Sequence, residues 1–99
     1  MSTVWIVQVD RRRDYSAAEE YGELKEVFSS INRAFEPKAA IEHARRVLKN
    51  MQPGDYLAMA GDPALCAICV TVAAEYFGSC EILRWDKQKL NYSTMLLQF

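Results

Sequence analysis

The stretch Tyr56-Leu57-Ala58-Met59-Ala60-Gly61-Asp62-Pro63 decides the fold, because it joins an apolar strand directly to the start of a helix. An unbroken apolar run of this length is typical of a strand buried on both faces. Gly61 permits a tight exit from the strand, Asp62 is a favoured helix N-cap, and Pro63 fits the first helical position. A strand that leads straight into a helix predicts an α/β unit.

Two main helices are predicted. The first runs from Pro63 to about Phe77 and is stopped by Gly78. Because Glu75 is its only charged residue, we expect it to be the most buried helix. The second begins near Pro37 and carries apolar residues at three- and four-residue spacing. That apolar stripe consists of Ala40, Ile41, Ala44, Val47, Leu48 and Met51.

Other strands flank these units. Val4–Val9 is rich in β-branched residues, and Glu81–Trp85 and Leu90–Phe99 form a hairpin around a turn at 86–89. The segment 23–35 is ambiguous: we favour a strand at Glu23–Ser29 with a turn at Ser30–Arg33, and a helix remains the alternative.

The predicted order is β–β–α–β–α–β–β, with a short extra helix at Ser16–Tyr21 that begins in a Ser16-x-x-Glu19 capping box. The chain is therefore predicted to be a single small α/β domain over residues 1–99. Its mixed sheet has about five strands, a parallel core and a C-terminal β-hairpin.

Composition excludes several classes. The chain has 99 residues, a net charge of −1 and 51% apolar residues, so it is globular and carries no general attraction for nucleic acid or anionic membranes. Its longest apolar run, at 64–74, is shorter than the roughly 20 residues of a membrane span. There is no signal-peptide pattern, and three cysteines suit a reducing compartment, so we expect a soluble cytoplasmic protein.

One candidate ligand site follows from the topology. If Val4–Val9 and Tyr56–Ala60 are parallel neighbours, their carboxyl ends meet where α/β sheets bind ligands. That edge would gather Asp10, Arg11, Arg12, Arg13, Gly61 and Asp62. Arginines beside a helix N-terminus suit a phosphate or carboxylate. The competing interpretation is that Asp62 only caps the helix and that the arginines form a solvated turn.

No metal or cofactor is predicted. Asp10, Asp14 and Asp62 could hold Mg²⁺ at the same edge, but the three arginines would compete for their carboxylates. Cys66 and Cys69 lie inside the apolar helix and are interpreted as inert buried thiols. With Cys80 and His43 they have no zinc-site spacing.

No catalytic set is recognisable, so we lean against an enzyme. His43 is the only histidine, and no second catalytic group stands at a known spacing from it. We therefore predict that no hydrolase or transferase activity depends on His43. Trp85 and Tyr92, near Lys87 and Lys89, could stack single-stranded bases, but they also suit an ordinary cross-strand pair. Nucleic-acid binding is not expected.

Several short motifs resemble a group of small uncharacterised proteins of tailed bacteriophages. The motifs are Glu20-Tyr21-Gly22-Glu23-Leu24, Asp55-Tyr56-Leu57, Gly61-Asp62-Pro63, Ala73-Ala74-Glu75-Tyr76 and Leu83-Arg84-Trp85-Asp86-Lys87-Gln88. The resemblance implies a bacterial cytoplasm during infection and carries over no catalytic residues.

These observations favour a small phage accessory protein that binds a host or viral protein without catalysis. The alternative is a small-ligand or nucleotide-phosphate site around Asp10, Arg11 and Asp62. The final strand also matters, because Ser93–Phe99 carries no charged side chain to guard an open edge. Either this strand lies inside the sheet beside Glu23–Ser29, or it pairs with another chain, most simply in a two-fold homodimer.

Overall fold

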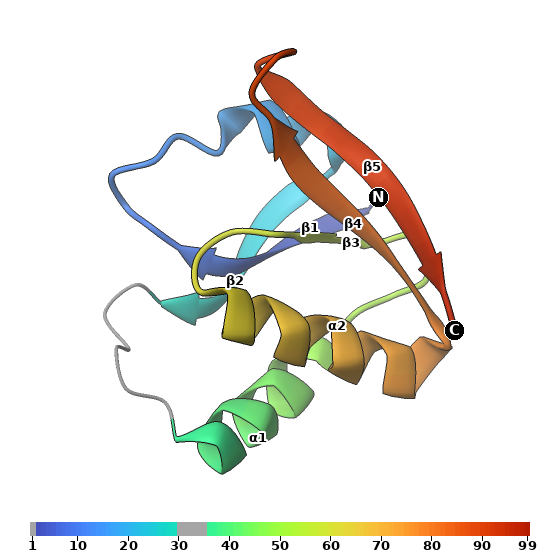
Figure 1. Cartoon of the computed structure of the whole chain (residues 1–99). Coiled ribbons are helices and arrows are strands. Elements are labelled where there is room, and N and C mark those ends of the chain that lie inside the picture. Colours follow the sequence, from blue (N-terminus) through green and yellow to red (C-terminus); the bar gives the residue numbers. More distant parts are fainter. Residues whose placement is uncertain (1, 30–35) are drawn as a thin grey trace.

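The computed structural model describes residues 2–29 and 36–99 as one five-stranded sheet with helices on both faces (Figure 1). The elements are β1 (Thr3–Val9), the 3₁₀ helix η1 (Ser16–Tyr21), β2 (Glu23–Ser29), α1 (Pro37–Leu48), β3 (Tyr56–Ala58), α2 (Pro63–Phe77), β4 (Ser79–Asp86) and β5 (Asn91–Gln98). The α/β prediction is confirmed. Residues 23–29 form a strand and not a helix, whereas the turn expected at Ser30–Arg33 lies outside the described residues.

The strand order β2-β1-β3-β4-β5 explains which helix covers which face. The strands β2, β1, β3 and β4 are parallel to one another, and β5 is antiparallel to β4. The connections β2-α1-β3 and β3-α2-β4 step in one direction across the sheet, so right-handed crossovers put α1 and α2 on the same face. The connection from β1 to β2 steps the other way, which places η1 on the opposite face (Figure 1).

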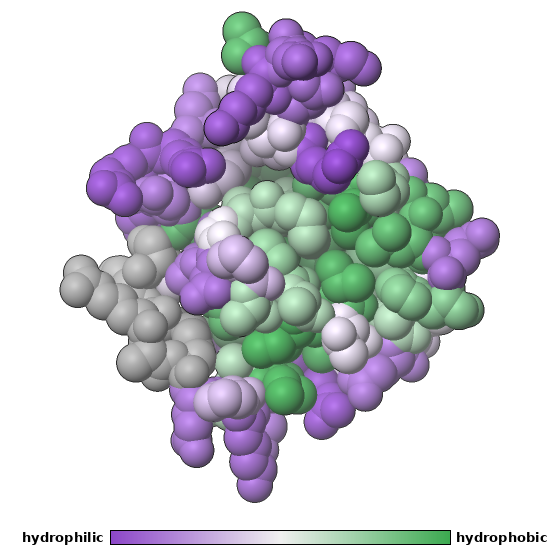
Figure 2. Space-filling model, in the orientation of Figure 1, coloured by the Kyte–Doolittle hydropathy of each residue, from purple (hydrophilic) through white to green (hydrophobic). Residues whose placement is uncertain are grey.

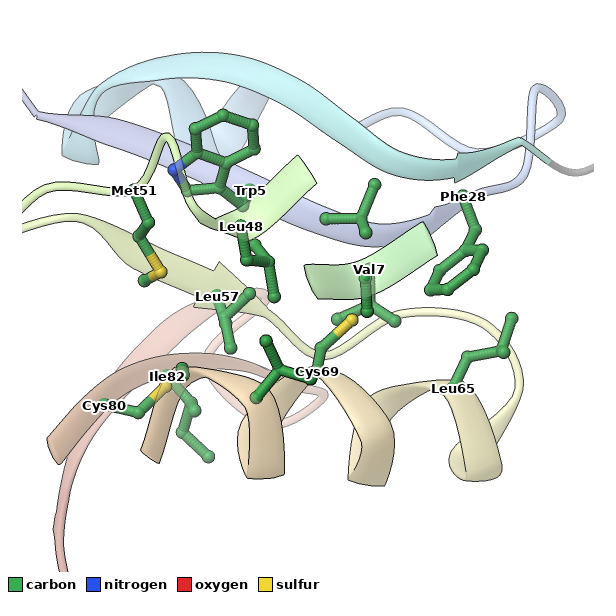
Figure 3. Close-up of a cluster of buried hydrophobic side chains, with 14 of the residues drawn as sticks. Trp5, Val7, Phe28, Leu48, Met51, Leu57, Leu65, Cys69, Cys80 and Ile82 are labelled. Carbon is green, nitrogen blue, oxygen red and sulfur yellow. The ribbon is translucent and has the colours of Figure 1, made fainter. Parts of the chain in front are cut away.

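The main core lies between the sheet and the two α-helices (Figure 3). Trp5, Val7 and Leu57 from the sheet meet Leu48 of α1 and Cys69 of α2. A smaller core fills the η1 face and consists of Val4, Ile6, Ala18, Ala58 and Leu83. Both faces of β1 are therefore buried, as its apolar sequence predicts.

One local expectation is wrong. The Ser16–Glu19 capping box does not form, because Ser16 is already the first residue of η1. Its N–H instead donates to the Asp14 carboxylate at 2.8 Å, and this hydrogen bond lowers the pKa of Asp14 below its usual value.

The helix α2 has more buried residues than α1 or η1, as expected, but it is not buried all round. Leu65, Cys69, Val72 and Ala73 point into the core, but the outer side, including Ala67 and Thr71, is exposed. The reason is topological: α1 and α2 share one layer, and no other described element covers it. An apolar helix sequence here does not mean burial all round.

Candidate functional site

The carboxyl ends of β1 and β3 do meet, as the sequence predicts. The two strands pair in parallel, and the Gln8 N–H donates to the Ala60 carbonyl at 3.2 Å beyond the regular ladder. Beside this edge lies an open pocket of about 430 Å³, lined in part by Asp10, Arg13 and Gly61. Three of the six predicted ligand-site residues therefore line one pocket.

The other three predicted residues do not line it. Arg12 is almost fully exposed and forms an ion pair with Asp10 at 3.2 Å. Its hydrogen bonds to that carboxylate lower the pKa of Asp10. Arg11 is also exposed. Asp62 caps α2, because its Oδ1 accepts a hydrogen bond from the Ala64 N–H at 2.8 Å. An anion at the start of α2 would thus meet a carboxylate that already accepts from one of the helix amides.

The loop between β3 and α2 also depends on Gln8, which sequence reasoning missed. Its Oε1 accepts a hydrogen bond from the Asp62 N–H at 2.8 Å. Gly61 adopts a φ of +88°, and any Cβ there would collide with the Gln8 side chain. Gly61 and Gln8 together hold the loop between β3 and α2 in place at the carboxyl edge. No local sequence pattern indicates this contact, because the two segments are far apart in the chain.

The carboxylates of this edge are dispersed rather than clustered. Asp10 faces Arg12, Asp14 accepts from Ser16, and Asp62 caps α2. Within residues 2–29 and 36–99, no three His, Cys, Asp or Glu side chains come together in a way that could hold a metal ion.

The cysteines are held as protonated thiols. Burial raises the pKa of Cys69 to about 12 and the pKa of Cys80 to about 11. Cys66 is half-buried rather than buried; its thiol donates to the Ala60 carbonyl at 3.6 Å, and desolvation raises its pKa as well. Because the thiolate is the reactive species, none of the three is poised as a nucleophile.

His43 has a structural position. Its Nε2 lies 2.6 Å from the Val27 carbonyl oxygen, so this nitrogen donates and ties α1 to β2. The ring also packs against Phe28, with centroids 4.8 Å apart. Trp85 and Tyr92 form a cross-strand pair in the hairpin, with ring centroids 5.2 Å apart.

The final strand lies at an open edge. β5 and β2 are at opposite sides of the sheet, so the interior position beside Glu23–Ser29 that one expectation allowed is wrong. The Phe99 N–H donates to the Gly78 carbonyl, and the Met59 N–H donates to the Leu83 carbonyl. Leu83 is the β4 partner of Thr94. By the alternation of an antiparallel ladder, the backbone groups of Thr94, Leu96 and Gln98 therefore point away from β4.

The two sheet edges differ in how they are protected. β2 carries Glu23, Lys25 and Glu26, and His43 covers one of its carbonyls. Among the described residues, hydrogen bonds to the outward backbone of β5 are found only at Tyr92: the Asn91 side chain accepts its N–H, and Tyr21 donates to its carbonyl. Such an uncharged edge is a template for strand pairing.

Exposed apolar side chains surround this edge. Phe77, Met95, Leu96 and Phe99 are all exposed, and together with the outward backbone of Thr94–Gln98 we call them the β5 surface. The hydrogen bond from Phe99 to Gly78 brings the end of the chain beside the end of α2. Figure 2 shows hydrophobic surface on the C-terminal half of β5 and over α2, whereas the hairpin tip is mostly hydrophilic.

A second cavity, of about 220 Å³, opens at the amino ends of β3 and β4. Leu96, Phe77, Met51, Glu81 and Asp55 are among its lining residues. Asp55 is 6% exposed and accepts three hydrogen bonds, from the Thr3 N–H, the Trp5 Nε1–H and the Gln52 N–H, at 2.9 to 3.1 Å. In the sequence Asp55 appears only in the short motif Asp55-Tyr56-Leu57, and its hydrogen bonds were not predicted.

Comparison with known proteins decides the family. A family model described as phage Pam3 gp32-like protein matches residues 2–99. The chain belongs to the phage Pam3 gp32-like protein family. This confirms the resemblance to small bacteriophage proteins that the short motifs indicate. No curated protein and no solved structure matches the chain.

For this member of the phage Pam3 gp32-like family, the candidate sites thus rest on geometry alone. The family description names no ligand and no reaction. None of the helices in the described part of the chain is long and apolar enough to cross a membrane.

Proposed function

We propose that the chain is a phage accessory protein of the bacterial host cytoplasm, which acts by binding a host or viral protein and not by catalysis. The β5 surface is the binding site. One observation carries the proposal: an edge strand without a charged side chain points the backbone groups of Thr94, Leu96 and Gln98 outward, amid exposed Phe77 and Phe99. Soluble monomers rarely leave such an edge open.

Strand addition is the binding mode that fits this edge. The partner contributes an extended segment whose backbone bonds to β5, and its side chains pack on the exposed apolar residues of both sheet faces. His43 and two of the cysteines, which are residue types that can act in catalysis, are held in structural positions instead. His43 is bonded to β2, and burial keeps the thiols of Cys69 and Cys80 protonated.

The test is affinity capture from phage-infected host lysate with the wild-type protein and with Thr94→Pro. Proline at this position removes an N–H that faces the partner and no N–H that faces β4. We expect a stoichiometric partner that is retained by wild type and lost from Thr94→Pro. Arg45→Ala, on α1, is the matched control and retains the partner. Equal capture by wild type and Thr94→Pro contradicts the proposed site.

A second candidate function is supported by the pocket of about 430 Å³ at the carboxyl edge. Arg13 and Gly61 line it, and the Tyr15 hydroxyl accepts the Asp10 N–H at 2.9 Å beside it. A small anion such as a nucleotide phosphate is the ligand class it suits. Titration calorimetry with inorganic phosphate and with a nucleoside triphosphate tests it, and binding that survives Arg13→Ala contradicts it.

The β5 edge also accepts a second copy of the chain. When the partner is absent, we propose that two β5 strands pair across a two-fold axis, since no charged side chains in Ser93–Phe99 oppose each other. The host or viral partner then competes with this homodimer for the edge.

A further inference from the structure

The η1 face of the sheet carries a row of residues that ends at the β5 surface. The strand register aligns Val4 with Tyr56, Tyr56 with Glu81, and Glu81 with Leu96. The helix η1 covers the start of this row, because the Tyr21 ring packs on Tyr56 with centroids 5.4 Å apart. Leu96, at the end of the row, is 55% exposed.

Glu81 is a half-buried carboxylate beside both apolar and polar groups, since Gln52, Asp55 and Ser79 also line its cavity. With Leu96, Phe77 and Met51 it lines the cavity of about 220 Å³. The ion pairs found within the described residues are Arg12 with Asp10 and Arg45 with Glu75, so neither includes Glu81. A carboxylate in such a position favours a cation from outside the domain.

A strand added to β5 would bring one residue directly opposite Leu96. Neighbouring strands lie about 4.8 Å apart, so this residue is about 10 Å from Glu81 across Leu96. A lysine or arginine spans that distance: its aliphatic stem lies over Leu96 and its charged head enters the cavity mouth at Glu81. An aspartate or glutamate there would repel Glu81, and a short side chain would not reach it.

We propose that the strand bound by β5 carries a lysine or arginine opposite Leu96, which pairs with Glu81. This inference rests on the proposed function, because it names the partner chemistry of the β5 surface. It also separates the partner from a second copy. Since Ser93–Phe99 contains no cation, a homodimer through β5 leaves Glu81 unpaired. A heterologous strand is therefore the better match for the site.

Selection from a library of short random peptides displayed on filamentous phage tests the inference whichever protein supplies the strand. The baits are wild type, Glu81→Gln and Thr94→Pro. We expect peptides selected on wild type to carry Lys or Arg at one fixed position and to bind Thr94→Pro weakly. The best peptide is then synthesised with arginine or with norleucine at that position, which keeps the stem and removes the charge.

The arginine-to-norleucine change should weaken binding to wild type about three- to tenfold and leave binding to Glu81→Gln unchanged. Glu75→Gln, which removes a carboxylate already paired with Arg45, is the matched control and should behave as wild type. The proposed pairing with Glu81 is contradicted if edge-binding peptides show no preference for Lys or Arg, or if such a preference survives Glu81→Gln. Either result leaves the proposed function intact. If no selected peptide depends on Thr94, the proposed function falls as well.

Discussion

At the scale of single residues, Asp55 holds the amino end of the sheet together. It is the one buried charged residue among those described, and its carboxylate joins the start of β1, the core indole of Trp5 and the turn before β3. Hydrogen bonds to a charged group contribute about 1.5–3 kcal/mol each, and removing a buried acceptor leaves its donors unpaired. Asp55 therefore acts as a structural residue although it lines a cavity.

We predict that Asp55→Asn lowers the free energy of unfolding by about 2–4 kcal/mol, because the amide turns a donor toward N–H groups. Urea denaturation at pH 7 measures this. Asp14→Asn is the matched control: its carboxylate is exposed and accepts one N–H, so it should cost less than about 1 kcal/mol. Equal losses for the two variants would show that Asp55 is not a structural anchor.

Substitutions at Gly61 and Gly78 distinguish the cost of backbone strain from the cost of a steric collision. Both adopt positive φ, but a Cβ at Gly78 meets nothing within 4 Å, whereas one at Gly61 collides with Gln8. We predict that Gly78→Ala costs about 1 kcal/mol and that Gly61→Ala costs at least about 1 kcal/mol more. Thermal unfolding of both variants checks the order. A Gly61→Ala protein as stable as Gly78→Ala would mean that Gln8 moves aside freely.

The buried thiols make stability depend on pH in the alkaline range. In the unfolded chain they release protons near pH 9, but in the folded chain only near 12 for Cys69 and near 11 for Cys80. Between these values the unfolded state binds fewer protons, so the free energy of unfolding falls as pH rises. The stability that the two protonated thiols contribute is complete below about pH 9 and is lost as the pH rises through 11 to 12.

We predict that wild type loses more stability between pH 8 and 10.5 than Cys69→Ala/Cys80→Ala, by up to about 1.4 kcal/mol per pH unit for each thiol. Urea midpoints at several pH values measure the difference, and the variant corrects for tyrosines and lysines that titrate in the same range. Parallel pH profiles would show that the thiols are not protected in the folded state.

At the scale of elements, the sequence predicts what is local and periodic. The order of strands and helices and the chemistry of Gly61-Asp62-Pro63 could be predicted, because turn and capping preferences act within a few residues. The exposed side of α2 could not, since its apolar residues indicate burial whichever layer it joins. The place of β5 at the edge, the hydrogen bonds of Asp55 and the contact of Gly61 with Gln8 depend on segments far apart in the chain.

The same reasoning holds for the candidate site. The sequence could predict that Asp10, Arg13 and Gly61 line one pocket, because parallel strands bring their carboxyl ends together. Arg12 does not line this pocket, because it pairs with Asp10. Asp62 does not line it either, because its carboxylate accepts from Ala64, as the capping interpretation predicts. The structure therefore confirms the interpretation of Asp62 as the N-cap of α2.

The alternation of β5 gives a prediction at this scale. The Thr94 N–H points away from β4, whereas the Met95 N–H points toward it, so proline should be tolerated at the first position and not at the second. We predict that Thr94→Pro remains folded and that Met95→Pro is less stable by at least about 2 kcal/mol. Circular dichroism and urea denaturation compare them. The reverse order would mean that the assigned edge of β5 is wrong.

At the scale of the whole molecule, the two sides of the sheet are unequal. The β2 edge is charged and partly covered by α1, while the β5 edge is uncharged and lies beside the exposed end of α2. A net charge of −1 gives little repulsion between copies of the chain. Self-association through β5 follows from this asymmetry unless another strand occupies the edge.

We therefore predict that the purified protein is a concentration-dependent dimer and that Thr94→Pro is a monomer. The two-fold pairing would centre near Leu96, so that Thr94 faces Gln98 of the partner copy and uncharged residues meet on both faces. Light scattering over a dilution series measures the mass, with Arg45→Ala as a control that should dimerise like wild type.

Hydrogen exchange adds an independent measurement, because dimerisation should slow exchange of the Leu96 and Gln98 amides in wild type at high concentration and not in Thr94→Pro. A wild-type mass that stays monomeric at high micromolar concentration would remove the dimer. Rapid exchange of these two amides under the same conditions would then show an edge that is open and available to a heterologous strand.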